Sequence, residues 1–114
     1  MKTWTPPTPA EVEQTLQEMV RRIVDGFHPE KIILFGSQAR GDAGPDSDID
    51  LLVVMETPSR RRSAVQMRMA LDDMVIPKDV AVVPPDEFER QRDIVGTLAY
   101  SAQHEGRVLY ERRR

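Results

Sequence analysis

The apolar positions near the start of the chain recur every three to four residues, which is the spacing of one face of a helix. They are Val12, Leu16, Met19, Val20 and Ile23. Thr8 and Glu11 precede this pattern with the spacing of a capping box, and Gly26 follows it as a typical helix end. The pattern predicts a helix over residues 9–25, after a loose, proline-rich lead of residues 1–8.

Four short apolar runs rich in β-branched residues predict strands. They cover residues 31–35, 49–55, 78–83 and 107–110. The segment between the first two runs is polar and rich in glycine and aspartate, which is typical of a loop. Only a short helix, Gln38–Arg40, is expected within it.

Two more helices are predicted in the second half of the chain. A methionine-rich face, formed by Met67, Ala70, Leu71 and Met74, predicts a helix over residues 59–74. A last helix, ended by Gly106, is indicated by the apolar positions Ile94, Val95, Leu98, Ala99 and Ala102.

This order of elements predicts an α+β fold, in which helices pack mainly on one face of a small, twisted, mixed sheet. The other face, or the strand ends, would then hold a functional site. With 114 residues and no linker-like segment, the chain is expected to be a single domain over residues 1–114.

Composition excludes several classes of protein. The chain has no cysteine, so it has no disulfide, thiolate metal site or cysteine nucleophile. No apolar run has the length of a membrane span and no targeting signal is visible, so a cytoplasmic protein with no membrane partner is expected. A net charge of −3 argues against direct binding of nucleic acid. The arginine clusters 60–62 and 112–114 are interpreted as a solvated helix start and a tail rather than as binding patches.

The first candidate for chemistry is Gly36-Ser37, which follows a buried strand and precedes a short helix. Glycine allows backbone N–H groups to approach an anion closely, and Ser37 offers a hydroxyl that can also cap the helix. Such a turn can hold a phosphate at the positive end of the helix. Alone, the pair is a weak signal, because glycine and serine are common in turns.

Three carboxylates form the second candidate. Asp48 and Asp50 alternate at the start of a strand, so both project from one face of the sheet. Asp79 interrupts an otherwise β-branched strand and would approach the other two if the strands are neighbours. Oxygen ligands of this kind suit Mg²⁺, and three of them could surround two ions.

At this point the chain resembles the minimal nucleotidyltransferase family, within the superfamily that includes DNA polymerase beta and the antibiotic nucleotidyltransferases. The matching segments are residues 34–41, LFGSQARG, and residues 47–53, SDIDLLV, with a ten-residue spacer between the Gly-Ser pair and Asp48. The two motifs at this spacing are far more specific than either one. The segment 105–110 resembles the terminal strand of the family.

The resemblance implies a metal-dependent transfer of a nucleotidyl group, with ATP as the substrate and two Mg²⁺ ions. Gly36 and Ser37 would bind the triphosphate, Asp48 and Asp50 would bind both metals, and Asp79 would complete the site and assist deprotonation of the acceptor. Arg40 would either contact phosphate or pair with the acidic cluster. Many minimal members act as antitoxins that modify a tyrosine of a small helical HEPN toxin, so a HEPN-type partner is expected by resemblance alone.

Two other functions stay open from the sequence. The chain could be a non-catalytic antitoxin that masks its partner, or an enzyme that modifies a small molecule such as an antibiotic. The remaining polar and aromatic residues are given structural roles: Trp4, His28, Asp42, Asp46, Tyr100, His104 and Tyr110.

Overall fold

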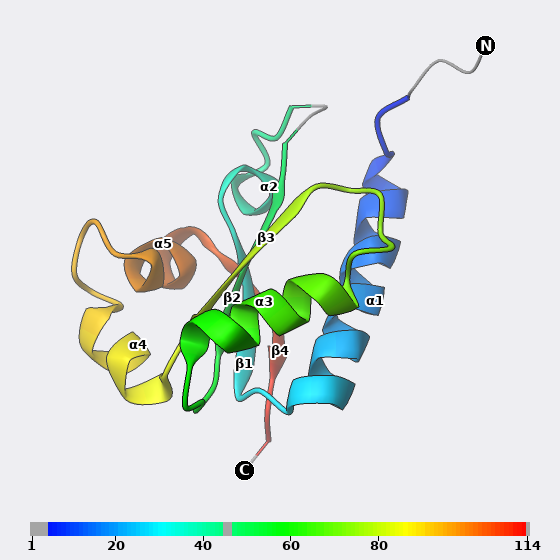
Figure 1. Cartoon of the computed structure of the whole chain (residues 1–114). Helices are drawn as coiled ribbons and strands as arrows, with labels where there is room; N and C mark the ends of the chain where they lie inside the picture. The colour runs from blue at the N-terminus through cyan, green and yellow to red at the C-terminus, as the bar shows by residue number, and fades with distance from the viewer. Residues whose placement is uncertain (1–4, 45–46, 114) are drawn as a thin grey trace.

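A four-stranded sheet in the order β3-β2-β1-β4 forms the centre of the protein (Figure 1). The computed structural model describes residues 5–44 and 47–113, so Trp4, Asp46 and Arg114 lie outside the described residues. The strands are β1 (Lys31–Phe35), β2 (Ile49–Val54), β3 (Lys78–Val83) and β4 (Arg107–Glu111). β1 is antiparallel to β2 and β4, whereas β2 and β3 are parallel. The mixed sheet and the four predicted strands are therefore confirmed.

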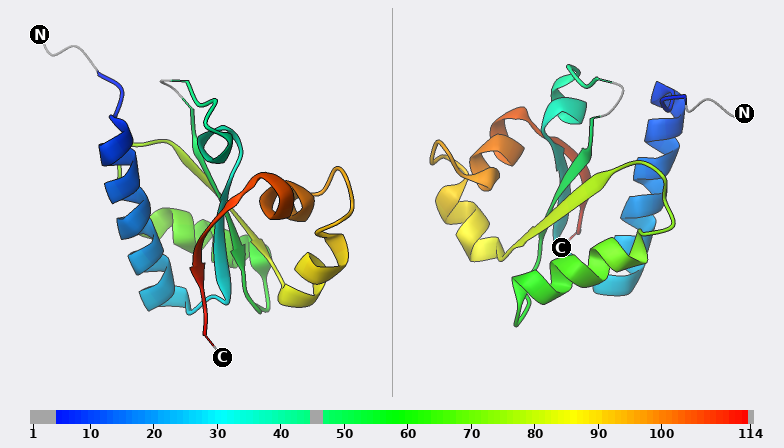
Figure 2. Two further views of the ribbon diagram at one scale, coloured as in Figure 1. Left: turned by 180° about the vertical axis from the view of Figure 1, so that it is seen from behind. Right: turned by 45° about the horizontal axis from the view of Figure 1, so that its top comes forward.

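Helices cover both faces of this sheet (Figure 2). They are α1 (Pro9–Phe27), α2 (Ser37–Arg40), α3 (Arg60–Ala70), α4 (Pro85–Gln91) and α5 (Leu98–Glu105). The larger core lies under α1 and α3, where Met19, Ile23 and Met67 are fully buried against the sheet. The smaller core on the opposite face contains Phe88 of α4 and Ala99 of α5. The α+β fold with its main helical layer on one face agrees with the prediction.

Helix α1 begins as predicted and ends later than predicted. The Thr8 hydroxyl accepts a hydrogen bond from the Glu11 N–H, and the Glu11 carboxylate accepts one from the Thr8 N–H. Gly26 does not stop the helix, because Phe27 still packs its ring against the core. The helix ends at His28, which adopts a left-handed conformation with φ of 54°.

The prediction for the last helix was wrong at its start. Ile94 and Val95 lie in the connection before α5 and are 53% and 79% exposed. In the smaller core, Phe88 of α4 packs where these residues were expected. The short helix α4 was not predicted, because the two prolines after β3 were interpreted only as the end of that strand. The predicted helix over residues 59–74 is also shorter, because a turn follows Leu71.

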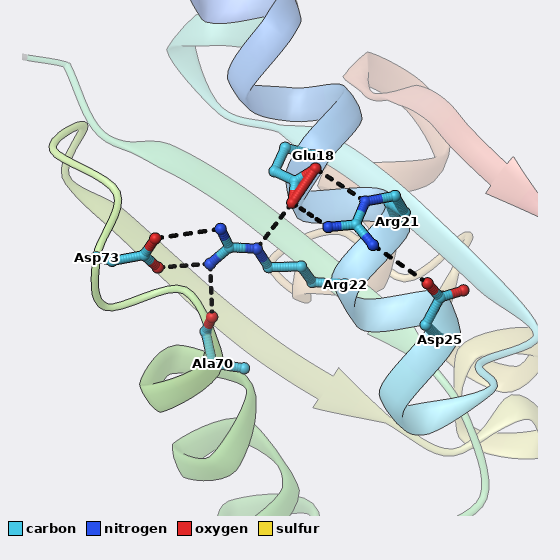
Figure 3. A network of polar contacts seen from close by, with 6 residues as sticks. All are labelled: Glu18, Arg21, Arg22, Asp25, Ala70 and Asp73. Carbon is cyan, nitrogen blue, oxygen red and sulfur yellow. Dashed lines mark hydrogen bonds and ion pairs between the residues drawn. The ribbon is translucent and has the colours of Figure 1, made fainter.

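A network of charged residues joins the ends of α1 and α3 (Figure 3). The Arg22 guanidinium donates to both carboxylate oxygens of Asp73, at 2.5 and 3.1 Å, and to the carbonyl oxygen of Ala70 at 3.0 Å. Glu18 accepts from Arg21 and Arg22, which lowers the pKa of the Glu18 carboxyl to about 2. These contacts fix the last turn of α3 relative to α1.

No helix in the described part of the chain is both long and apolar enough to cross a membrane.

Two glycines provide a matched test of the packing. A Cβ at Gly106 would lie 2.3 Å from the Ala102 carbonyl oxygen and 2.9 Å from that of Leu34, whereas a Cβ at Gly26 would meet nothing within 4 Å. Gly106→Ala should therefore lower the free energy of unfolding by about 1–3 kcal/mol. Gly26→Ala, within a helix, should raise it by up to about 1 kcal/mol. Urea unfolding of both variants checks this, and a neutral Gly106→Ala would contradict the packing.

Candidate functional site

The turn between β1 and α2 is built around Gly36. Its φ of 76° and ψ of −159° belong to a region that only glycine adopts readily. Gly36 is the N-cap of α2, and its carbonyl oxygen accepts hydrogen bonds from the Ala39 and Arg40 N–H groups, both at 3.1 Å. Ser37 is thus the first residue of the helix. The prediction that its side chain could cap the helix is wrong. The Ser37 backbone lies at the positive end of α2.

The carboxylate of Asp50 lies directly against this turn. Phe35 and Asp50 are paired across the antiparallel β1 and β2 strands, so the next residue, Gly36, is beside Asp50. A Cβ on Gly36 would lie 2.4 Å from Asp50 Oδ2. The missing side chain at residue 36 therefore makes room for the carboxylate.

Asp79 is brought beside Asp50 by the parallel pairing of β2 and β3, in which these two residues are directly in register. Leu52 and Val83 belong to the core under α4 and α5, and side chains alternate along a strand, so Asp50 and Asp79 are on that same face. This is the face opposite the larger helical layer. The carboxylates lie toward the ends of the strands, beyond the smaller core.

Electrostatics show that the three carboxylates share one region. Partial burial raises the pKa of Asp50 above its usual value, and the negative charges of Asp48 and Asp79 raise it further. The positive charge of Arg40 acts in the opposite direction. The sequence therefore identified groups that interact in the folded chain.

The carboxylates are near one another without converging on a point. Among residues 5–44 and 47–113, no group of three acidic or histidine side chains is arranged tightly enough to hold a metal ion. The donor set nevertheless fits Mg²⁺, because all three groups offer oxygen ligands and the ion pairs of the described chain do not engage Asp48 or Asp50. A divalent cation would offset the repulsion between them.

Arg40 pairs with acidic residues outside this set. Its Nε atom lies 3.3 Å from Asp42 Oδ2 and its Nη1 atom 3.6 Å from Glu105 Oε2. Asp42 thus has a structural role in the loop. Glu105, at the end of α5, had no local motif by which sequence reasoning could have connected it to α2.

Gln38 of α2 and Ser47, to which the sequence assigned no role of their own, support the approach to Asp48. The Gln38 side-chain amide donates to the Ser47 carbonyl oxygen at 3.4 Å, and the Ser47 hydroxyl accepts from the Gly44 N–H at 2.8 Å. These bonds hold the chain just before Asp48. The histidines have structural contacts instead: His28 ends α1, and His104 Nε2 lies 3.1 Å from Asp93 Oδ1.

A family model described as a nucleotidyltransferase domain matches residues 12–109. The chain belongs to this family. A candidate protein adenylyltransferase of Methanocaldococcus jannaschii is 32% identical over 100 residues, which cover 86% of this chain and 97% of that relative. The protein is therefore a nucleotidyltransferase, as the spacing of its Gly-Ser and Asp-x-Asp motifs predicted.

Solved structures share the fold of this nucleotidyltransferase. A candidate nucleotidyltransferase from Sulfolobus solfataricus aligns with a TM-score of 0.61 and 22% identity, over 87% of this chain and 79% of that one. A toxin–antitoxin structure with AMP-PNP aligns with a TM-score of 0.54 and 23% identity, over 86% and 74% of the two chains. At this level of identity the likeness establishes the common architecture.

The raised pKa of Asp50 leads to a prediction about stability. The folded state binds the Asp50 proton more tightly than the unfolded state, so the free energy of unfolding falls as pH rises from about 4 toward neutrality. Asp50→Asn should stabilise the protein at pH 7, by up to about 1 kcal/mol, and give no such gain at pH 3. Urea unfolding at both pH values checks this. Asp72→Asn, in an exposed turn, is the control, and an equal gain at both pH values would refute the electrostatic cause.

The contact between Gly36 and Asp50 leads to another prediction. Gly36 and Gly41 both have positive φ, so alanine strains the backbone at either position, yet only Gly36→Ala would also displace the Asp50 carboxylate. Gly36→Ala should weaken Mn²⁺ binding by at least about tenfold, and Gly41→Ala should change it little. Titration calorimetry measures both. Similar affinities for the two variants would mean that the contact does not position Asp50.

Proposed function

We propose that this nucleotidyltransferase transfers AMP from ATP, in the presence of Mg²⁺, to a hydroxyl group of a protein. The observation that carries the proposal is the contact between Asp50 and the Gly36 turn, with Asp48 and Asp79 beside it. A turn suited to phosphate thus adjoins carboxylates suited to cations. Membership of the nucleotidyltransferase family supports the interpretation of this turn and these carboxylates as a site for a nucleotide and cations.

The chain's own residues would divide the work as follows. The backbone at Gly36 and the Ser37 hydroxyl hold the triphosphate at the positive end of α2. Asp48 and Asp50 hold two Mg²⁺ ions, and Asp79 completes the ligand set. When bound, such ions stabilise the charge that builds up on the phosphate and make a hydroxyl a better nucleophile.

Asp79 would also accept a proton from the acceptor hydroxyl. The oxygen then attacks the α-phosphorus of ATP, a new P–O bond forms, and the bond to pyrophosphate breaks. Arg40 would assist by contacting phosphate once it releases Asp42 or Glu105. Both of its pairs are exposed, so exchanging one for a phosphate costs little.

A protein acceptor is supported by the relatives. The Methanocaldococcus jannaschii relative, at 32% identity, carries the description of a candidate protein adenylyltransferase. Toxin–antitoxin complexes share the fold, and one of them contains AMP-PNP, an analogue of ATP. The motif resemblance adds that the acceptor would be a tyrosine of a HEPN-type toxin, with this chain as the antitoxin.

Transfer of label from ATP labelled at the α-phosphate tests the proposal. The protein, purified with whatever binds it, should label a second protein in the presence of Mg²⁺. Asp48→Asn and Asp50→Asn should each reduce the rate at least about 100-fold, because charge stabilisation at the reacting phosphate is lost. Asp72→Asn removes a carboxylate away from the site and serves as the control.

Two other outcomes would favour the alternative functions. Stable binding of the partner without labelling, by any nucleotide, would indicate an antitoxin that masks its partner. Labelling of an added antibiotic and of no protein would indicate a small-molecule enzyme. Either result would overturn the protein acceptor.

A further inference from the structure

Arg68 connects helix α3 to the candidate active site. Its Nη1 atom lies 3.7 Å from Asp79 Oδ1, and the two side chains are 48% and 66% exposed. The spacing between Arg68 and Asp79 follows no local motif, so the sequence alone does not connect them.

The backbone of Arg68 is firmly placed. The preceding residue, Met67, is fully buried in the larger core, and so is Leu71 one turn later. Arg22 binds the carbonyl oxygen of Ala70 and the carboxylate of Asp73, so α1 holds the same turn from outside (Figure 3). The Arg68 guanidinium therefore reaches Asp79 from a turn of α3 whose position is fixed.

The position of Asp79 makes this contact possible. β3 is one of the two edge strands of the sheet, with β2 as its neighbour on the inner side. Asp79 is in register with Asp50 on β2, and Arg68 approaches it from α3. Asp79 thus lies between a carboxylate whose charge repels it and a guanidinium whose charge attracts it.

The contact draws Asp79 toward α3, whereas a cation shared with Asp50 would draw it toward β2. The charges of the three carboxylates interact, yet in the described chain they do not close into a group that could hold a cation. An ion pair with Arg68 offsets part of the repulsion that Asp79 would otherwise experience. Because the pair is exposed and 3.7 Å long, it is weak enough for a divalent cation to displace.

We propose that Arg68 is a positioning residue that holds Asp79 at the edge of the sheet and releases it when a divalent cation enters between Asp79 and Asp50. This inference rests on the proposed function, because it requires Asp79 to be a cation ligand. Arg68 and the cation then compete for one carboxylate. The competition sets the cation affinity of the protein before nucleotide binds.

Mn²⁺ binding without nucleotide, measured by calorimetry on the whole chain, tests the proposal. Arg68→Gln should tighten binding about two- to fivefold, the range expected when a competing exposed ion pair is removed. Arg68→Lys keeps the charge and should remain close to the wild type. Arg61→Gln removes the same charge from the same helix, about 10 Å away along its axis, and should have a smaller effect.

A double-mutant cycle separates this competition from a general change of charge. In the Asp79→Asn background, Arg68→Gln should no longer tighten Mn²⁺ binding. An equal gain in both backgrounds, or no gain in the wild-type background, would overturn the role of Arg68. Thermal melting of each variant establishes that it is folded, which is expected because Arg68 is exposed.

The outcomes also distinguish this inference from the proposed function. Suppose that the wild type binds Mn²⁺, that the Asp48→Asn variant does not, and that the Arg68→Gln variant binds it as tightly as the wild type. Only the role of Arg68 then fails. If the wild type binds no Mn²⁺, the metal site of the proposed function fails, and the role of Arg68 fails with it.

Discussion

The antiparallel pairing of β1 with β2 is the constraint on which the rest of the site depends. It sets Phe35 opposite Asp50, so the chain leaves β1 through Gly36 directly beside that carboxylate. The parallel pairing of β2 with β3 then adds Asp79 in register. Two strand pairings thus assemble groups from three separate segments, and the helices serve to hold those strands in place.

This arrangement places repulsive charges at the end of a well-packed sheet. β2 carries the fully buried Ile49, Leu51 and Val53 on the face of α1 and α3, and Leu52 on the face of α4 and α5. Burial on both faces stabilises the strand, which offsets the cost of leaving three carboxylates close together. The apolar residues of β2 thus stabilise the same strand in which Asp50 interacts unfavourably with the charges of Asp48 and Asp79.

Local patterns in the sequence predicted most of this architecture. The capping box of Thr8 correctly predicted where α1 begins, and the apolar runs predicted every strand of the sheet. The errors arose where tertiary contacts overrode local signals, as when Phe27 extended α1 past Gly26 and Phe88 took the core position expected of Ile94.

The candidate site likewise combines residues that the sequence predicted with contacts that it did not. Gly36, Asp48 and Asp50 belong to motifs with fixed spacing, and Asp79 follows from its polar character in an apolar strand. The contact of Arg40 with Glu105 joins segments distant in sequence, and that of Arg68 with Asp79 joins a helix to the strand that follows it, at a spacing that matches no local motif, so only the folded chain reveals them.

The period of two along β2 restricts how sequences of this kind can change in length. Asp50 and Leu51 occupy opposite faces, so a single inserted or deleted residue within the strand would turn a carboxylate toward the apolar core and leucine toward the Gly36 turn. Over evolutionary time, descendants of this chain can exchange apolar residues of similar size within the strand, while the number of residues in the strand must stay fixed.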